Sequence, residues 1–437
     1  MKSFKTLGII PEVIDILNKK GIKTPTPIQE EAIPPAFKGN DLITKAQTGT
    51  GKTLAFLLPI LQRINTDVHQ EQALIIAPTR ELIKQIADEA KIIGDAIGVD
   101  VLPLIGGKTI ESQLQQLGRR PHVILGTPGR LLDHAERGSL HLDTIRRIVL
   151  DEADQMLHMG FLPDIETLIG RTHANRQLLL FSATIPDRVR ALAKTYMKKP
   201  MSVSVEGNHV TLDTIEQRVY MMNEEDKLPR LKKMLREDNP FLAIVFCNTK
   251  EGAMRLFNQL AGEGFNMEEL HGDMTQGRRT QVLKEFSKAK IQILIATDIA
   301  ARGIDIEGIS HIYNYDVPHD VDYYIHRIGR TGRAGSTGIA NMFVTPADEI
   351  WLRRIERAIQ ATLTKYTKDG QVKVKGKEIA PKKVKTSKKP TNTSSYQATK
   401  AKAHKATGHK GSNKRVRKTK ESSSGRGGNN RSGRGRR

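Results

Sequence analysis

Short runs of apolar and β-branched residues recur along the chain, each bounded by small or polar residues and followed by a stretch of helical periodicity. Continuous apolar strands that alternate with helices are typical of parallel sheets that are covered on both faces. The pattern therefore predicts an α/β architecture, with strands at Asp41–Thr44, Ala73–Ala77, Val123–Leu125, Ile148–Leu150, Leu178–Phe181, Ala243–Phe246, Ile291–Ala296, His311–Tyr315 and Ile339–Val344.

These runs fall into two series, which a polar stretch near Val205–Thr211 separates. A chain of 437 residues is long enough for two or three domains, so the two series predict two α/β domains in tandem. We place the first domain at residues 31–206, the linker at 207–212 and the second domain at 213–366, with the hinge near 206–208. No repeat with a period of about 20–50 residues indicates a solenoid.

The composition changes after Tyr366, where Lys, Ser, Thr and Gly dominate and apolar residues are too sparse to form a core. Residues 367–437 are therefore predicted to be a disordered tail. Residues 371–437 carry 22 of the 70 lysines and arginines and only two acidic residues, a net charge of +20, which leaves +2 for residues 1–370. This asymmetry indicates a polyanionic partner, with nucleic acid as the first candidate. A solvating spacer is the alternative role for the tail.

No segment approaches the roughly 20 apolar residues of a membrane span, and the N-terminus lacks the apolar core of a signal peptide. The single cysteine, Cys247, excludes an internal disulfide and lies in an apolar run, so we expect it in the core. These features favour a cytoplasmic protein.

Acidic residues end the strand predicted at Ile148–Leu150, where the sequence continues as Asp151-Glu152-Ala153-Asp154. In open α/β sheets, ligands bind at the carboxyl edge of the strands. A carboxylate at that edge can hold Mg²⁺ on a nucleotide, and its neighbour can activate a water molecule. A solvated acidic turn explains these four residues equally well, so the interpretation depends on the rest of the chain.

A glycine-rich segment joins the strand predicted at Asp41–Thr44 to a helical stretch. Its glycines allow backbone N–H groups and the helix N-terminus to face phosphate oxygens. Lys52 would reach the β- and γ-phosphates, and the Thr53 hydroxyl would ligate Mg²⁺ together with Asp151. The alternative is a purely structural turn. The segment, which we name the phosphate loop, consists of Ala46, Gln47, Thr48, Gly49, Thr50, Gly51, Lys52 and Thr53.

A basic segment in the second predicted domain, His326–Arg333, has the sequence H-R-I-G-R-T-G-R. Alone it would indicate a solvated or phosphate-contacting surface. Opposite a phosphate loop it becomes a source of arginine fingers, which stabilise charge on a transferring phosphoryl group and can raise the rate about 10³–10⁵-fold. Hydrolysis would then require closure of the two domains.

The phosphate loop, D-E-A-D, Ser182-Ala183-Thr184 and H-R-I-G-R-T-G-R, in this order, resemble the motifs of DEAD-box RNA helicases. The basic tail resembles the extensions of the bacterial cold-shock-type members. The resemblance extends from Phe4 to about Gly335. It implies two RecA-like domains, RNA-stimulated ATP hydrolysis, and local opening of short RNA duplexes. It also implies a role in RNA remodelling, such as cold adaptation, ribosome assembly or RNA decay.

The resemblance implies roles for individual residues at the ATP site. Within an adenine-recognition segment at residues 1–30, Phe4 would stack on the adenine ring and Gln29 would bind its edge, which favours ATP over GTP. Asp151 would hold Mg²⁺ and Glu152 would be the general base. The remaining roles fall to Asp305 at the ribose, Arg330 and Arg333 as arginine fingers, and Asp154, Ser182, Thr184 and His326 in coupling ATP state to domain arrangement.

The same resemblance implies an RNA interface made of loops at the sheet edges. Arg and Thr side chains and glycine backbone suit phosphates and sugars rather than base edges, so binding is predicted to be independent of sequence. The implied RNA contacts are Thr79, Arg80, Gly107, Thr127, Arg130, Arg279 with Gln276 beside it, Thr297 and Arg302.

Two positions depart from the family pattern: Gln155 stands where Arg is common, and His158 where Asp is common. Neither is expected to contact phosphate or RNA. The single tryptophan, Trp351, is expected to anchor a helix.

Three functions remain open at this point: an RNA-dependent ATPase that opens short duplexes, a non-catalytic RNA clamp or annealing chaperone, and a translocating DNA helicase. Retention of Lys52, Glu152, Arg330 and Arg333 disfavours the clamp. Gln29 and its proline-rich loop disfavour the DNA helicase.

Overall fold

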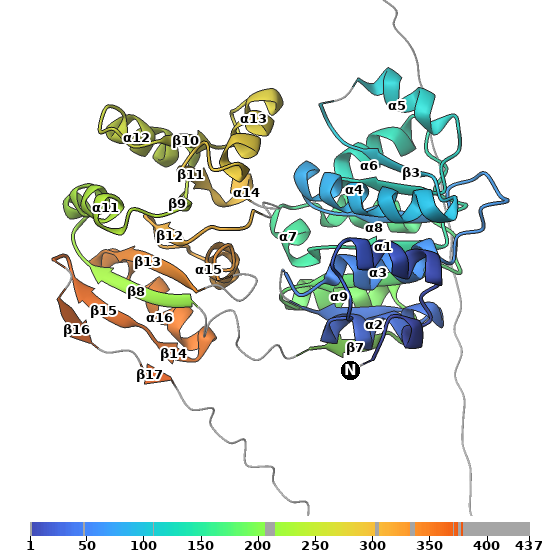
Figure 1. The fold of residues 1–437 in the computed structure, drawn as a ribbon, viewed down its shortest axis with the longest axis horizontal. Coiled ribbons are helices and arrows are strands. Elements are labelled where there is room, and N and C mark those ends of the chain that lie inside the picture. Colours follow the sequence, from blue (N-terminus) through green and yellow to red (C-terminus); the bar gives the residue numbers. More distant parts are fainter. Residues whose placement is uncertain are drawn as a thin grey trace, which may run out of the picture. The chain divides into compact units, whose positions relative to one another are not determined.

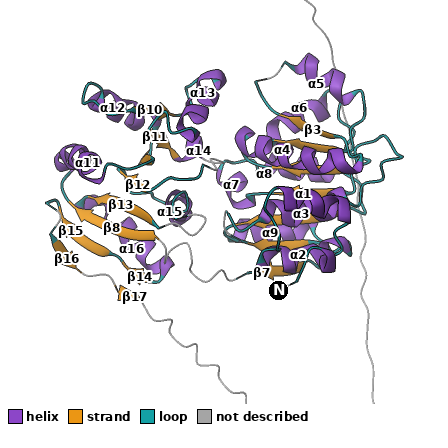
Figure 2. Ribbon diagram, in the orientation of Figure 1, coloured by secondary structure: helices purple, strands orange, loops and turns teal. Residues whose placement is uncertain are grey.

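The computed structural model describes residues 2–46, 49–107, 109–205, 215–301, 306–332, 337–369, 371–374 and 377–378. The chain within these ranges folds into two lobes, each built on a parallel sheet (Figures 1 and 2). No described helix combines the length and the apolar character that crossing a bilayer requires.

The first lobe contains a sheet whose seven described strands all pair in parallel, in the order β3-β4-β2-β5-β6-β1-β7. The strands are β1 (Leu42–Lys45), β2 (Ala73–Ile76), β3 (Val101–Leu104), β4 (Val123–Gly126), β5 (Arg147–Leu150), β6 (Gln177–Ser182) and β7 (Met201–Ser204).

Helices cover both faces of this sheet. One face packs against η1 (Lys5–Leu7), α1 (Pro11–Lys19), α2 (Pro27–Phe37), α3 (Lys52–Leu61) and α4 (Arg80–Ile97). The other packs against α5 (Ile110–Leu117), α6 (Pro128–Glu136), α7 (Ala153–His158), α8 (Leu162–Gly170) and α9 (Asp187–Tyr196).

The second lobe repeats this plan, with strand order β10-β11-β9-β12-β13-β8-β15-β16 in the described residues. Its strands are β8 (Ile215–Met221), β9 (Ala243–Cys247), β10 (Met267–Leu270), β11 (Ile293–Thr297), β12 (His311–Asn314), β13 (Gly338–Val344), β15 (Thr364–Thr367) and the antiparallel β16 (Val372–Val374). A separate pair joins β14 (Ala361–Thr362) to β17 (Lys377–Glu378).

The helices of the second lobe also lie on both faces of its sheet. One core includes residues of α13 (Gln276–Ser287), α14 (Asp298–Ala301), α15 (Val321–Ile328) and α16 (Glu349–Ile359). The other core includes residues of α11 (Glu224–Asp238) and α12 (Lys250–Leu260). The short helix η2 (Pro346–Asp348) precedes α16.

The continuous apolar strands are explained by this two-sided packing. Successive side chains of a strand point to opposite faces, so Leu74 and Ile76 of β2 enter one core while Ala73 and Ile75 enter the other. Each of the nine predicted strands overlaps an observed one, and the two-domain α/β prediction is confirmed.

The predicted start of the tail at residue 367 is wrong. Strand β15 extends to Thr367, and β16 adds to the same sheet through pairing of Lys365 with Val374. The run Val372-Lys373-Val374 has the alternation of an edge strand, but it is too short to stand out within a lysine-rich segment. The proposed linker, residues 207–212, lies outside the described residues.

Candidate functional site

The phosphate loop and the D-E-A-D segment meet at the carboxyl edge of the first sheet. Strands β5, β6 and β1 are neighbours in that sheet, so the residues that follow them lie close together. The N–H of Ala46, directly after β1, donates to the carbonyl oxygen of Ser182 at the end of β6 (2.9 Å). Asp151 directly follows β5, and Lys52 begins α3. Gln47 and Thr48 lie outside the described residues.

Two groups of opposite charge are buried at this edge without a hydrogen-bond partner in the part of the chain that the structure describes. Lys52 Nζ and the Glu152 Oε2 atom are both buried and make no hydrogen bond among the described residues. A buried charge without a partner is costly, so such groups indicate a missing ligand. The ammonium group of Lys52 suits a nucleotide phosphate, and the carboxylate of Glu152 suits an attacking water that donates a proton.

The charge distribution also fits a divalent cation. The pKa of Asp151 is raised to about 6, mainly by burial and to a smaller extent by the carboxylates of Glu152 and Asp154, against the opposing effect of Lys52. A cation at Asp151 would relieve both the burial and the repulsion. Thr53, the second residue of α3, offers a hydroxyl of the kind that completes a Mg²⁺ site on a bound nucleotide.

Glu152 has an unusual backbone conformation. Its φ of 50° lies in the left-handed region, where a non-glycine residue is strained by roughly 1–3 kcal/mol. The N–H of Glu152 donates to Oδ1 of Asp151 (2.9 Å), and Glu152 is the residue directly before α7. The left-handed backbone conformation therefore sets the orientation of the Glu152 side chain, the predicted general base, at the end of β5.

Gln29 connects the adenine-side segment to the phosphate loop. Its Oε1 atom accepts from the N–H of Thr26 (2.9 Å), and its Nε2 atom donates to the carbonyl oxygen of Gly51 (3.0 Å). A Cβ on Gly51 would lie 2.5 Å from this Nε2 atom, so the close approach requires glycine, as does the φ of +89°. Gln29 thus positions the loop, while its contact with adenine stays a prediction.

The structure does not support a stacking role for Phe4. This side chain is only 2% exposed and belongs to the core of the first lobe. Phe4 is the residue directly before η1. A buried ring offers no face to adenine unless the N-terminal segment moves. In this structure Phe4 anchors that segment, and its stacking on adenine stays a prediction.

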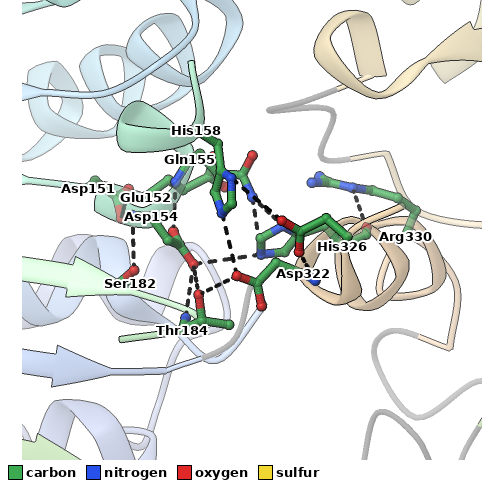
Figure 3. Close-up of polar contacts among 11 residues, drawn as sticks. Asp151, Glu152, Asp154, Gln155, His158, Ser182, Thr184, Asp322, His326 and Arg330 are labelled. Carbon is green, nitrogen blue, oxygen red and sulfur yellow. Dashed lines mark hydrogen bonds and ion pairs between the residues drawn. The ribbon is translucent and has the colours of Figure 1, made fainter. Parts of the chain in front are cut away.

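The coupling residues predicted from sequence come together between the lobes (Figure 3). The hydroxyl of Ser182 accepts from the N–H of Asp154 (3.1 Å), and both the N–H and the hydroxyl of Thr184 donate to Asp154 Oδ2 (2.9 Å each). The same Thr184 hydroxyl lies 3.1 Å from Oδ2 of Asp322 in α15. The hydroxyl proton of Thr184 can therefore be donated either to Asp154 of the first lobe or to Asp322 of the second.

The two departures from the family pattern lie at this same contact, which sequence reasoning missed. The Nε2 atom of Gln155 donates to Nδ1 of His326, and His158 Nε2 lies 3.5 Å from Oδ2 of Asp322. His158 also contacts Asp320, at 3.8 Å. Residues 155 and 158 are about one helical turn apart, and both contact residues of the second lobe.

The ionisation of this contact follows from burial. Burial lowers the pKa of His326, against the smaller raising effect of Asp154. Burial alone would raise the pKa of Asp322, but its bonds with His158 and Thr184 outweigh it and the pKa is lowered. A neutral His326 that accepts from Gln155 beside an ionised Asp322 is therefore the favoured state.

The arginines of H-R-I-G-R-T-G-R have different environments. Arg330 lies two residues beyond the end of α15 and donates from Nε to the carbonyl oxygen of His326 (3.2 Å) (Figure 3). Arg327 points into the lobe, is 1% exposed and forms a two-bond ion pair with Asp298 (2.6 and 2.7 Å). Arg327 is therefore structural. Arg333 lies outside the described residues, as do Arg302 and Asp305.

Most of the predicted RNA contacts line one hollow of about 630 Å³. Its walls come from both lobes and include Thr79, Arg80, Gly107, Thr127, Arg130 and Arg279 together with Gln276. Thr297, the last residue of β11, is not in its lining and is nearly buried. Apolar side chains that sequence reasoning did not predict, Met159, Phe161, Met274 and Ile299, add to the walls.

Polar groups of this hollow bond to one another in the structure. Arg80 donates to Oε1 of Gln276 (3.1 Å), and Arg279 lies 3.3 Å from Glu81. A Cβ on Gly106 would come within 2.4 Å of the Arg80 guanidinium, so glycine lets Arg80 cross that loop. The hollow thus presents guanidinium groups of the type that bind phosphates.

Comparison with known proteins agrees with this geometry. Residues 26–192 match the model of the DEAD/DEAH box helicase family, and residues 226–335 match that of the helicase conserved C-terminal domain. The DEAD-box ATP-dependent RNA helicase CshA of Geobacillus kaustophilus is 46% identical over 82% of this chain and 76% of the relative. The CshA helicase of Listeria monocytogenes is 45% identical over 82% of this chain and 68% of its own.

Solved structures with the same fold contain nucleotide and RNA. Dbp5 of Saccharomyces cerevisiae, bound to RNA and ADP BeF3, has a TM-score of 0.76 and 34% identity and covers 84% of this chain and 96% of its own. Mss116, bound to single-stranded RNA and AMP-PNP, has a TM-score of 0.73 and 33% identity over 81% of this chain and 76% of its own.

Proposed function

Because the chain belongs to the DEAD-box ATP-dependent RNA helicase family, we propose that its two lobes divide the reaction between them. The first lobe binds ATP at the phosphate loop. The second lobe supplies guanidinium groups and completes the RNA groove. The observation that carries this proposal is that Lys52 Nζ and Glu152 Oε2 are buried without a hydrogen-bond partner among the described residues, at an edge that contacts α15 of the second lobe.

In the first lobe, Lys52 would bind the β- and γ-phosphates, and Thr53 and Asp151 would hold Mg²⁺, which neutralises phosphate charge. Glu152 would accept the proton of the attacking water, and its left-handed backbone fixes that carboxylate in place. Ala46, Gly49, Thr50 and Gly51 would line the phosphates with backbone.

In the second lobe, Arg330 and Arg333 would reach the γ-phosphate and Asp305 the ribose when the lobes close. A guanidinium that meets the developing charge only in the closed form makes hydrolysis depend on closure. Thr184, which lies between Asp154 and Asp322, connects this closure to the D-E-A-D segment.

RNA would bind in the hollow lined by Arg80, Arg130 and Arg279, displacing Glu81 and Gln276 from the arginines. A strand held by both lobes is bent as they close, and a duplex that cannot follow the bend separates locally. Phosphate release then reopens the lobes. We place this activity in the cytoplasm, in RNA remodelling such as cold adaptation, ribosome assembly or RNA decay.

ATP hydrolysis should be measured with Mg²⁺ alone, with single-stranded RNA and with single-stranded DNA of the same sequence. The proposal expects strong stimulation by RNA and little by DNA. Equal rates with and without RNA would contradict it. Stimulation by DNA equal to that by RNA would instead indicate a DNA helicase.

A further inference from the structure

Helix α16 presents a basic face that the proposed mechanism does not use. Leu352, Ile355 and Ile359 are buried in the core of the second lobe, while Arg353, Arg354 and Arg357 are exposed. With Glu349 and Ile350, these arginines line a surface hollow of about 510 Å³. The exposed fraction of Ile350 is 55%, so the hollow combines an apolar side chain with three guanidinium groups.

The single tryptophan forms part of the same face. Trp351 is half-buried, rests partly on the core and stacks on His319 with ring centroids 4.7 Å apart. The Arg354 guanidinium lies 4.5 Å from its ring centroid. Trp351 therefore packs against the core, as expected of a residue that anchors the helix, but only with part of its ring. The rest is a His–Trp–Arg stack that reaches the surface.

Carboxylates near α16 leave most of this positive charge uncompensated. Glu349 pairs with Arg353 (2.9 Å). Glu356, the other acid of the helix, is nearly buried and bonds to the N–H of Leu363 and to Lys365 on β15. Within the described ranges, Arg354 and Arg357 take part in no ion pair.

The basic tail begins beside this face. Arg353 and Glu349 line a second hollow together with Lys365 of β15 and Val374 of β16, the last strand of the sheet. The chain from Gln371 to Arg437 carries a net charge of +20. The basic tail therefore follows, along the chain, a strand that borders the same hollow as α16.

We propose that the α16 face binds the phosphate backbone of an RNA segment outside the groove between the lobes. Arg353, Arg354 and Arg357 contact phosphates, and a base or sugar packs on Ile350 and the edge of Trp351. Arginine beside a partly exposed aromatic ring is a combination that binds single-stranded nucleic acid. Protein surfaces also use Arg and Trp, but the uncompensated charge of this face and the net positive charge of the tail in the same chain favour a polyanion.

This inference rests on the proposed function, because it assigns flanking RNA to a helicase that already holds RNA in its groove. The short RNA for the test is the shortest oligonucleotide that gives full stimulation of ATP hydrolysis. The long RNA carries an additional single-stranded extension. Only the long RNA should reach α16.

The first experiment uses the unmodified full chain, in which Trp351 is the only tryptophan and reports on this face directly. We expect the long RNA to change Trp351 fluorescence and the short RNA, at saturation, to leave it unchanged. An unchanged emission with the long RNA would overturn the proposal, as would the same change with both RNAs.

The second experiment replaces Arg353, Arg354 and Arg357 together by Gln. Affinity for the long RNA should fall about tenfold at low salt, and the log–log salt slope should flatten by about 2, from roughly 0.7 for each of three phosphates. Affinity for the short RNA and ATP turnover at saturating RNA should not change. Long-RNA affinity equal to the unmodified chain would overturn the proposal and leave the face to a protein partner.

The matched control carries the same loss of charge on the first lobe, through Gln at the exposed cations Arg188, Arg190 and Lys194 of α9. It should bind both RNAs like the unmodified chain. A loss as large as that of the α16 variant would show a general charge effect and overturn the site. Failure of the underlying function is distinguishable, because the unmodified chain would then show no stimulation of ATP hydrolysis by RNA.

Discussion

Replacement of Glu152 by Gln should raise the thermal stability of the first lobe while it abolishes ATP turnover. The side chain is 7% exposed, and its Oε2 atom has no hydrogen-bond partner among the described residues. It also lies beside Asp151, whose pKa it helps to raise. A neutral amide of the same shape removes a buried charge and one source of repulsion.

The size of the gain follows from Asp151. Its pKa of about 6, against an ordinary value of 3.8, corresponds to about 3 kcal/mol in favour of the neutral acid. Burial is the largest cause and the Glu152 charge is a smaller one, so the variant recovers roughly 1 kcal/mol or less. In a lobe of this size, 1 kcal/mol corresponds to a rise in Tm of about 2–4 °C.

The loss of activity is larger. A positioned general base contributes roughly 10²–10⁴-fold, and an amide cannot accept the proton. RNA-stimulated turnover should fall by at least that factor, while binding of a fluorescent ATP analogue and of RNA persists.

Turnover and Tm should be measured together on the Glu152→Gln protein and on Glu136→Gln, an exposed carboxylate-to-amide control. The control should change neither. Turnover within about threefold of the unmodified chain would remove Glu152 from the base role. A Tm several degrees lower would refute the assignment of Glu152 as a destabilised buried charge.

Three further predictions concern the lobe contact and the tail. Asp322→Asn loses a charged acceptor for Thr184, so RNA-stimulated turnover should fall about tenfold while unstimulated turnover is unchanged; equal losses in both would contradict the coupling role. Because burial lowers the pKa of His326, the closed form loses stability as pH falls through 6.5. Energy transfer between dyes on the two lobes should therefore decrease in acid. If a His326→Gln protein shows the same decrease, His326 is not the group whose protonation destabilises the closed form. Removal of residues 379–437, which retains β16 and β17, should weaken RNA binding and flatten its salt dependence; loss of ATPase at saturating RNA would refute a purely affinity-enhancing tail.

The strands that sequence patterns predicted are those buried on both faces. Strands β3, β7, β8 and β10 escaped because they are short or carry polar residues, as in Met201-Ser202-Val203-Ser204, of which only Val203 is buried. The position of such strands depends on pairing with neighbours distant in sequence, as β7 pairs with β1. The local pattern of apolar and polar residues does not predict that pairing.

Individual site residues were predictable where a single motif fixes them. Lys52 and Asp151 follow from strand–loop–helix signals, but the difference between Arg327 and Arg330 follows from their places in the fold. Arg327 lies within α15 and points to Asp298 in the lobe interior, whereas Arg330 lies beyond the end of α15 and donates to the carbonyl oxygen of His326. A composition of repeated Arg and Gly does not distinguish them.

The contacts of Gln155 and His158 were not predictable, because they connect residues more than 160 positions apart across two lobes. The burial of Phe4 was not predictable for a related reason: it depends on residues of several helices that form one core with it. Both features concern tertiary environment rather than residue chemistry.

The central claim is that ATP and RNA together close the lobes, and energy transfer between one dye on each lobe tests it most directly. Cys247 is fully buried, so cysteines placed at the exposed positions Glu136 and Lys288 can be labelled selectively. Transfer should rise only when a non-hydrolysable ATP analogue and RNA are both present, and should fall after ATP is hydrolysed. The same transfer with neither ligand, with one or with both would contradict the account.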